Sequence, residues 1–495
     1  MKRFILSILP AVILAGVIAL LLVAGASAQS PSPSLLFSFP CNAEFVCADG
    51  FFPTSLIESP DGNFYGTAVG GGVGLNAQGT VFKMTPSGDV SVIFSFAEEP
   101  SGLLPYGSSP NGLVEGTDGF LYGVATFNGP LGLGTVFKLS KSGTIEDLHD
   151  FCADEECSDG AYPTFITQAI DGNFYGATGP SSPPANVIFR LSPTGTFKVV
   201  HVFEAAKTPL DGSGAFGLLQ APDGNFYSTT VAGEQNSPFN TVFRFTPTTD
   251  AYKILHDFNF SDYAASNLAQ TASGELFGLQ VNSELYEIST AGKYQALGPL
   301  STTQYLDGGI LVASDGNLWG TFQGGDCGDQ GMVFAATTTG TVLQNIIFDC
   351  TTVGETLGPM IQAADGKFYG VTAGNGGVSQ TGLTNGTIWV MDAGLPEPSP
   401  TIVNFSPASG ASGTKVLLQG QHFVGTTAVS FDGVPATFQV LTVNYISITV
   451  PSGAKTGKIA VTNGGGTITS TKAFEIPQIP NRMGTVSGHR SVASS

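Results

Sequence analysis

The chain has 495 residues, enough for several small domains or for one large repeat fold with an added module. Only 11% of the residues are charged, whereas 66 are glycine and 36 are phenylalanine, a composition typical of short strands joined by tight turns. The net charge of −20 disfavours nucleic acids and anionic membrane surfaces as partners. No long amphipathic helical pattern is present, so we expect an all-β protein.

The N-terminus has the pattern of a secretory signal peptide. Lys2 and Arg3 precede a long apolar stretch, which ends at the small residues Ala26-Ser27-Ala28. We predict a signal peptide over residues 1–28 and a secreted, cell-surface or periplasmic protein without a transmembrane domain after cleavage. The apolar stretch is also long enough to cross a bilayer, so a retained anchor is the alternative.

A six-residue phrase recurs seven times along the chain. It spans Asp61–Gly66 in its first copy and Asp365–Gly370 in its last, 304 residues further on in six steps of about 51. The copies read DGNFYG, DGFLYG, DGNFYG, DGNFYS, SGELFG, DGNLWG and DGKFYG. A period of this length is typical of a four-stranded propeller blade.

Each repeat is predicted to contain four antiparallel strands. In the first repeat they cover residues 55–58, 63–68, 79–84 and 90–96, with Pro-Asp-Gly and Pro-Ser-Gly turns at one end. The seventh repeat has no fourth strand after Met391, but residues 34–39 carry the fourth-strand pattern ahead of the first repeat. We therefore predict a seven-bladed propeller over residues 34–394, closed by this N-terminal strand. An open solenoid is the alternative.

The recurring order DGNFYG, Gly-Gly, GTVFK and Pro-x-Gly resembles that of the GloVer tandem-repeat proteins, which are secreted bacterial chains. The resemblance covers residues 34–394 and is weakest in the fifth repeat, where Ser273 replaces the aspartate. It implies an extracellular repeat fold and carries over no catalytic residue.

The pattern changes after a proline-rich linker at residues 395–400. Residues 401–477 contain about seven short strand patterns without a Cys–Trp–Cys core, which favours a small immunoglobulin-like sandwich. This segment resembles the IPT/TIG module. Residues 478–495 are polar and unpatterned, and we expect them to be disordered.

All six cysteines fall in the loops opposite the Pro-Asp-Gly turns. Their repeat positions predict three local disulfides, Cys41–Cys47, Cys152–Cys157 and Cys327–Cys350. We expect these bonds to brace one face of the propeller, since no C-x-x-C redox motif is present.

Metal binding is considered at two places. The repeated turn aspartates are better explained as ligands of local backbone amides. The second place is the loop that carries Asp154, Glu155, Glu156 and Asp159, where oxygen donors suit Ca²⁺. Apart from this calcium hypothesis we predict no cofactor. A zinc site is disfavoured because the propeller histidines recur one repeat apart.

A polar position lies three residues before each turn aspartate, on the innermost strand. It is occupied by Glu58, Glu115, Gln168, Gln220, Gln270, Val312 and Gln362. Two hypotheses remain open for this collar. It is either a binding site along the propeller axis or a hydrogen-bonding network with channel water.

We predict a non-enzymatic recognition or adhesion protein, a monomer that binds an extracellular glycan or protein on the loop face. The alternative is a polysaccharide lyase or hydrolase that uses Glu58 and Glu115 as acid and base. Sialidase chemistry is disfavoured because the propeller contains only Arg190 and Arg244 as arginines.

Overall fold

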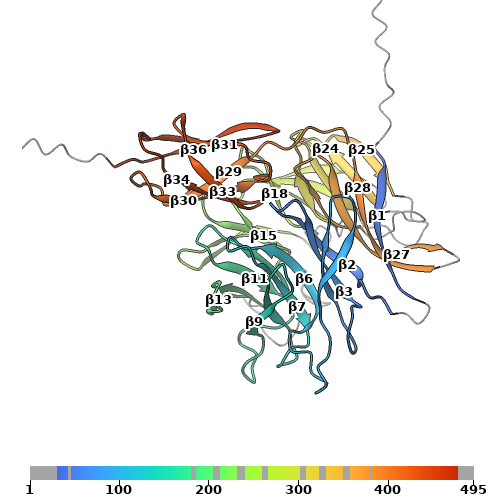
Figure 1. Cartoon of the computed structure of the whole chain (residues 1–495). Helices are drawn as coiled ribbons and strands as arrows, with labels where there is room; N and C mark the ends of the chain where they lie inside the picture. Colours follow the sequence, from blue (N-terminus) through green and yellow to red (C-terminus); the bar gives the residue numbers. More distant parts are fainter. Residues whose placement is uncertain are drawn as a thin grey trace, which may run out of the picture. The chain divides into compact units, whose positions relative to one another are not determined.

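The computed structural model describes residues 31–42, 46–179, 186–203, 212–230, 240–258, 266–281, 283–301, 308–322, 331–348, 357–379 and 382–477 (Figure 1). Within these ranges all regular structure is β-strand or turn, so the all-β prediction is confirmed. No helix in the described part of the chain is long and apolar enough to cross a membrane. The predicted signal peptide and the predicted disordered tail lie outside the described residues.

Strands β1 to β28 form seven four-stranded antiparallel sheets, one for each repeat. The first strands of repeats one to seven are β2 Phe51–Glu58, β6 Ser108–Glu115, β10 Pro163–Gln168, β14 Leu219–Gln220, β18 Ala269–Gln270, β22 Ile310–Val312 and β26 Leu357–Gln362. The second strands are β3 Phe64–Gly70, β7 Leu121–Phe127, β11 Phe174–Thr178, β15 Phe226–Thr229, β19 Leu276–Leu279, β23 Leu318–Phe322 and β27 Phe368–Ser379.

The outer half of each sheet follows the same order. The third strands are β4 Thr80–Met84, β8 Thr135–Leu139, β12 Asn186–Leu191, β16 Thr241–Thr246, β20 Glu284–Ile288, β24 Met332–Ala336 and β28 Gly382–Met391. The fourth strands of repeats one to six are β5 Val90–Ser95, β9 Ile145–Asp150, β13 Phe197–Phe203, β17 Ala251–Asp257, β21 Tyr294–Pro299 and β25 Val342–Ile347. In repeat one the predicted strands are present, and the first begins earlier than predicted, at Phe51.

The seventh sheet takes its fourth strand from the other end of the repeat region. Strand β1, Pro33–Pro40, pairs antiparallel with β28, with Pro33 opposite Met391 and Leu35 opposite Trp389. The sheet order is therefore β1-β28-β27-β26. This pairing supplies backbone partners to β28, which otherwise would be a long unpaired edge.

The glycine that ends the repeated phrase is required by close packing between strands. A Cβ atom on Gly66 would lie 2.3 Å from the Phe82 ring, and one on Gly176 would lie 2.3 Å from the Phe189 ring. The ring of the third strand thus covers the backbone of the second strand in each case. This contact explains why the phrase ends in glycine so often.

Apolar clusters join each sheet to the next. One cluster contains Tyr65 of repeat one and Leu121 of repeat two, and similar clusters join each later pair of repeats. A further cluster contains Phe39, Leu56 and Phe82 together with Tyr369 and Ile388, so the first and last repeats are packed against each other. The core is therefore distributed between the sheets rather than gathered in one place.

Residues 401–474 form two further four-stranded sheets. One has the order β29 Thr401–Ser406, β30 Lys415–Gln421, β34 Tyr445–Thr449, β33 Thr437–Thr442. The other has the order β32 Val434–Pro435, β31 Ala428–Phe431, β35 Gly457–Asn463, β36 Gly466–Phe474. They enclose an apolar core that includes Val416, Ile446 and Phe474. The sandwich has eight strands, one more than predicted, because Val434 and Pro435 form a two-residue strand after a tight turn.

Candidate functional site

The aspartate of the repeated phrase has the same local role in most repeats. In repeat three the Asp171 carboxylate accepts hydrogen bonds from the Asn173 backbone amide at 2.9 Å and from the Tyr175 hydroxyl at 2.9 Å. Equivalent aspartate–tyrosine bonds of 2.7 to 2.9 Å occur in repeats one, two, four and seven. These carboxylates are thus used to hold a turn and a buried hydroxyl, as their Asp-Gly context indicates.

Repeat five changes both partners of this bond together. Ser273 replaces the aspartate and Phe277 replaces the tyrosine, so neither a carboxylate nor a phenolic hydroxyl is present. In repeat six, the Trp319 Nε1 group takes the place of the hydroxyl, 3.4 Å from Asp315. The unusual fifth phrase is therefore an apolar version of the same packing unit.

The six polar collar residues share one place in the fold. Each is the last residue of the first strand of its repeat: Glu58, Glu115, Gln168, Gln220, Gln270 and Gln362. Their side chains are buried or partly buried and lie close to the Asp-Gly turns. The structure therefore brings these predicted residues to one level of the inner strands.

Four of the collar side chains bond to the preceding repeat. The backbone N–H of Thr117 donates to Gln168 at 2.9 Å, that of Ile170 to Gln220 at 3.0 Å, and that of Ser314 to Gln362 at 2.8 Å. The N–H of Ala364 in repeat seven donates to Glu58 in repeat one at 3.0 Å. Each donor lies two residues after its own collar position, and we call these contacts the collar brackets.

The glutamine side chains also bond within their own repeat. Gln168, Gln220, Gln270 and Gln362 each donate from Nε2 to the carbonyl oxygen of the turn glycine four residues later, at 2.9 to 3.2 Å. A glutamine thus joins its own turn to the preceding repeat, whereas a glutamate can only accept. The sequence pattern predicted the ring of polar residues but not this role, because the partners are backbone amides.

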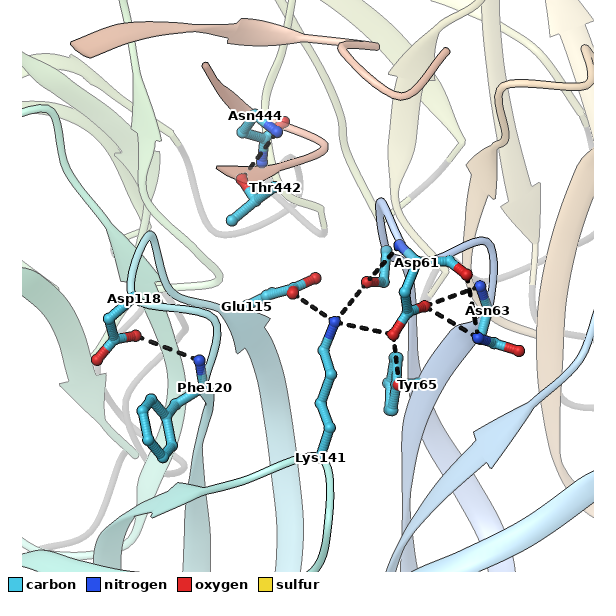
Figure 2. A network of polar contacts seen from close by, with 10 residues as sticks. Asp61, Asn63, Tyr65, Glu115, Asp118, Phe120, Lys141, Thr442 and Asn444 are labelled. Carbon is cyan, nitrogen blue, oxygen red and sulfur yellow. Dashed lines mark hydrogen bonds and ion pairs between the residues drawn. The ribbon is translucent and has the colours of Figure 1, made fainter. Parts of the chain in front are cut away.

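We call the contact between two neighbouring repeats a joint. Proline prevents the collar bracket at two joints. Pro60 and Pro222 occupy the donor position, and proline has no N–H. At the first of these joints Lys141 replaces the missing donor. Its Nζ lies 2.6 Å from Glu115 Oε1, 3.0 Å from Asp61 Oδ2 and 2.7 Å from Ser59 Oγ. Figure 2 shows this ammonium group placed between the two carboxylates.

These surroundings change the acidity of the carboxyl groups. Burial raises the pKa of Glu58 to about 7, against the opposing bond from Ala364 and with a contribution from Asp365. Burial also raises the pKa of Glu115, although Lys141 opposes this change. At Asp61 burial is outweighed by hydrogen bonds from Tyr65, Lys141 and Asn63, which hold its pKa near 2.

The acidic loop of the calcium hypothesis does not converge on one point. Asp154 accepts bonds from the Ser158 amide and hydroxyl, while Asp159 accepts from the Cys152 amide at 2.9 Å and contacts His149 at 3.1 Å. In the described part of the chain, no group of three or more His, Cys, Asp or Glu side chains is placed to hold a metal ion. Asp154 and Asp159 are thus bonded within their own loop, and calcium binding at Asp154, Glu155, Glu156 and Asp159 stays a prediction.

Two of the predicted disulfides are formed in the structure. Cys41 is bonded to Cys47 and Cys152 to Cys157, each within one loop. Cys327 and Cys350 lie outside the described residues, so the third pair stays a prediction.

The repeated histidines have a packing role that sequence reasoning missed. His149 stacks on Phe197 with ring centroids 3.6 Å apart, His201 on Tyr252 at 3.9 Å, and His256 on Tyr294 at 4.0 Å. Each partner ring belongs to the fourth strand of the next repeat. This role could have been found from the sequence, because the histidines and their aromatic partners recur with the same repeat period.

A cavity of about 530 Å³ is lined by the first strands of the repeats and by residues just before them. We call it the inner-strand cavity. Its lining includes Leu113, Phe165, Phe216, Asn267 and Pro359, which precede the collar positions and so lie toward the loops. Among its described lining residues, Tyr227 is the sole ionisable side chain, and it is fully buried with its hydroxyl bonded to Asp223.

Two polar side chains of this cavity, Asn267 and Ser266, are hydrogen-bonded within the protein. Asn267 donates to the Ile310 carbonyl at 3.2 Å and accepts from the Ile310 amide at 3.0 Å. Ser266 accepts from the Leu279 amide at 3.0 Å and donates to the Asn267 carbonyl at 2.8 Å. Among the described lining residues, the cavity therefore offers apolar surface, backbone groups and the Thr167 hydroxyl, without a carboxylate, imidazole or amine.

The C-terminal sandwich contacts the collar from the turn side. Its Tyr445 hydroxyl donates to the Gln168 carbonyl at 2.8 Å, and Gln419 Nε2 donates to Gln220 Oε1 at 2.8 Å. The turn between β33 and β34 lines a cavity of about 50 Å³ together with Glu58 and Glu115. This space holds roughly a few water molecules.

Comparison with known families supports both parts of this architecture. Residues 52–284 and 214–433 match the family model described as the Gloeobacter/Verrucomicrobia repeat, and residues 400–476 match the IPT/TIG domain. No curated protein matches the chain.

Solved structures give weaker matches. They include a fungal alcohol oxidase of the AA5 family in complex with copper, with 13% identity, coverage of 90% of this chain and 100% of the other, and a TM-score of 0.48. A gluconolactonase from Xanthomonas campestris has 15% identity, coverage of 59% and 88%, and a TM-score of 0.36. Regucalcin, a calcium-binding protein from Agrobacterium tumefaciens, has 12% identity, coverage of 58% and 92%, and a TM-score of 0.40. TM-scores below 0.5 at this level of identity support no statement about function.

Proposed function

The chain belongs to the Gloeobacter/Verrucomicrobia repeat family, and from this premise we propose that it is a secreted recognition protein. In this proposal the seven sheets are the blades of a closed propeller. The pairing of β1 with β28 and the cluster that joins the first and last repeats support closure. The bracket from Ala364 to Glu58 supports it as well.

The recognition site lies on the loop face, around the mouth of the inner-strand cavity. The observation that carries this proposal is the chemistry of the cavity, which offers mainly apolar side chains and no carboxylate, imidazole or amine among its described lining residues. Such a surface suits binding rather than catalysis. The two local disulfides support the same face, because they brace loops on this side.

The alternative, a polysaccharide-degrading enzyme, depends on Glu58 and Glu115. Glu58 lines a cavity of about 330 Å³ that Glu115 does not line, and Glu115 is paired with Lys141. The space that both carboxyl groups line has only about 50 Å³, which holds a few waters rather than a sugar unit between an acid and a base. The raised pKa values of the two carboxyl groups are explained by burial, and we adopt the recognition hypothesis.

The test is a binding screen of the mature chain, residues 29–495, against a glycan array, a panel of polysaccharides and extracellular proteins. We expect a ligand whose affinity falls at least about tenfold in Phe216→Ala, a loss of about 1.4 kcal/mol of binding free energy. Phe120→Ala is the matched control, because Phe120 and Phe216 are both 37% exposed and Phe120 lies in the Asp-Gly turn of repeat two.

Two results would contradict the proposal. One is equal loss of binding in the Phe120 and Phe216 variants. The other is release of product from a polysaccharide by the wild-type protein, abolished by Glu58→Gln or Glu115→Gln. The second result would establish the enzyme.

A further inference from the structure

The loops of repeats one and two expose an unusual number of large apolar side chains. Six of them are between 47% and 67% exposed: Val46, Val73, Leu75, Leu103, Phe127 and Leu131. We call this set the loop-face patch. Large apolar side chains exposed together on neighbouring loops are a common mark of a protein–protein contact site.

Backbone and side-chain bonds join the loops that carry the patch. The Gly72 N–H donates to the Cys47 carbonyl at 2.9 Å, and the Glu98 N–H donates to the Leu75 carbonyl at 2.8 Å. Gln78 connects this group to repeat two, since its carbonyl accepts from the Ser109 N–H at 2.9 Å. The Cys41–Cys47 disulfide closes one of these loops. The patch is therefore presented by loops that hold one another in place.

The charges on this side of the repeats have one sign. The described loops that follow the second and fourth strands of the repeats contain seven acidic residues and no lysine or arginine: Asp49, Glu98, Glu99, Asp154, Glu155, Glu156 and Asp159. The lysine and arginine ion pairs of the described residues lie at the turn end instead, as at Lys141–Asp61 and Lys198–Asp250. The patch thus sits in a negative field that is not neutralised locally.

From this combination we infer that the loop-face patch binds a basic protein partner, through a segment in which aliphatic side chains alternate with lysine or arginine. Aliphatic anchors would bury the patch, and the cationic residues would face Asp49, Glu98 and Glu99. A glycan fits less well, since its hydroxyl groups need donors and acceptors that valine and leucine side chains lack. The inference rests on the proposed recognition function and names the partner class of the loop face.

The test measures binding of short labelled peptides to the mature chain by fluorescence anisotropy. Three peptides of equal length are used, built from Lys and Leu, from Lys and Ser, and from Glu and Leu. We expect the Lys–Leu peptide to bind, the Lys–Ser peptide to bind at least about tenfold more weakly, and the Glu–Leu peptide not to bind. Raising salt from about 0.05 M to 0.5 M should weaken the Lys–Leu complex, because exposed charges are then screened.

Substitutions locate the site. Leu75→Ser and Val73→Ser should each weaken the Lys–Leu complex about tenfold, and Glu98→Gln with Glu99→Gln should weaken it at low salt only. Ile347→Ser is the matched control, because Ile347 is 61% exposed on strand β25 and Leu75 is 58% exposed. All five positions are exposed or partly exposed, so the melting temperature should change little and serves as the check on folding.

Three results would overturn the inference. They are unchanged affinity in both patch variants, equal binding of the Glu–Leu peptide, and self-association of the chain that the patch variants abolish, which would assign the patch to a second copy. The experiment also distinguishes failure of this inference from failure of the proposed function. Binding of a neutral glycan at the loop face without the Lys–Leu peptide would refute this inference alone, whereas the absence of any loop-face ligand would refute the proposed function.

Discussion

The bond between the phrase aspartate and the tyrosine four residues later shows how much one residue pair contributes to a repeat. Tyr175 is fully buried, and its hydroxyl finds its partner in Asp171. A buried hydroxyl without a partner destabilises a fold by about 1–3 kcal/mol. Repeat five avoids this cost because it lacks both groups, at Ser273 and Phe277.

We therefore predict a strong coupling between Asp171 and Tyr175. Asp171→Ser should lower the free energy of unfolding by about 1–3 kcal/mol, because the buried Tyr175 hydroxyl loses its carboxylate acceptor. Tyr175→Phe should cost about 1 kcal/mol. The double variant should cost less than the sum of the two, which a double-mutant cycle by chemical denaturation measures. Strict additivity of the two changes would show that the pair is not a unit.

The sequence was sufficient to predict the role of the turn aspartates, but not the hydrogen-bond partners of the collar side chains. The Asp-Gly context was sufficient to predict turn chemistry at Asp61 and its repeats, since the interaction is local. Three collar brackets join residues 48 to 51 positions apart and the fourth spans 306 positions, each through a backbone N–H, which leaves no trace in side-chain identity. Two prolines, Pro60 and Pro222, were the available clue that a donor is missing at two joints.

At the scale of elements, the predicted strands of the repeats and the C-terminal sandwich were accessible from the sequence because the pattern is repeated seven times. Short strands with weak patterns were harder to place. The two-residue strand at Val434 and Pro435 has no periodicity of its own, and it exists because a tight turn folds it against β31. The strand ends also differ from prediction in repeat one, because pairing extends β2 back to Phe51 and β3 on to Gly70, whereas β4 and β5 are each one residue shorter than predicted.

The N-terminal strand permits a direct test of its role in the last sheet. Phe39 is fully buried and packs edge-on against Phe82, with ring centroids 5.4 Å apart, so it joins repeat seven to repeat one. We expect Phe39→Ala to lower the free energy of unfolding by about 3–5 kcal/mol. Leu35→Ala on the same strand, where the side chain is 46% exposed, should change it by less than about 0.5 kcal/mol.

The measurement is equilibrium denaturation followed by intrinsic fluorescence, which Trp389 on the paired strand β28 reports. Similar losses in the two variants would mean that β1 acts through its backbone pairing alone. No loss in either variant would refute the assignment of β1 to the seventh sheet.

At the scale of the whole molecule, Glu58 and Ala364 connect the two ends of the repeat region, and the burial of Glu58 at this contact makes stability depend on pH. Burial raises the pKa of Glu58 from about 4.5 to about 7. The folded protein therefore keeps a proton that the unfolded chain has lost between these values. This contribution to stability is complete below pH 4.5 and is lost as the pH rises through 7.

We predict that the wild-type protein loses more stability than Glu58→Gln between pH 5 and pH 8, by up to roughly 3 kcal/mol. Glutamine is neutral throughout this range, so it removes the dependence while keeping an acceptor for Ala364. The exposed substitution Glu146→Gln is the control and should follow the wild-type curve. Parallel curves for wild type and Glu58→Gln would refute the assigned role.

The two prolines in the donor positions make the seven joints of the repeat array unequal. Four joints have a collar bracket and the first has the Lys141 contact, whereas the two joints beside repeat five, at Pro222 and at Val312, have neither. These two joints are held by packing and by the bonds Thr229–Ser266 and Asn267–Ile310. We therefore expect heat or a pulling force to separate the array first beside repeat five, far along the chain from the strand that joins its ends.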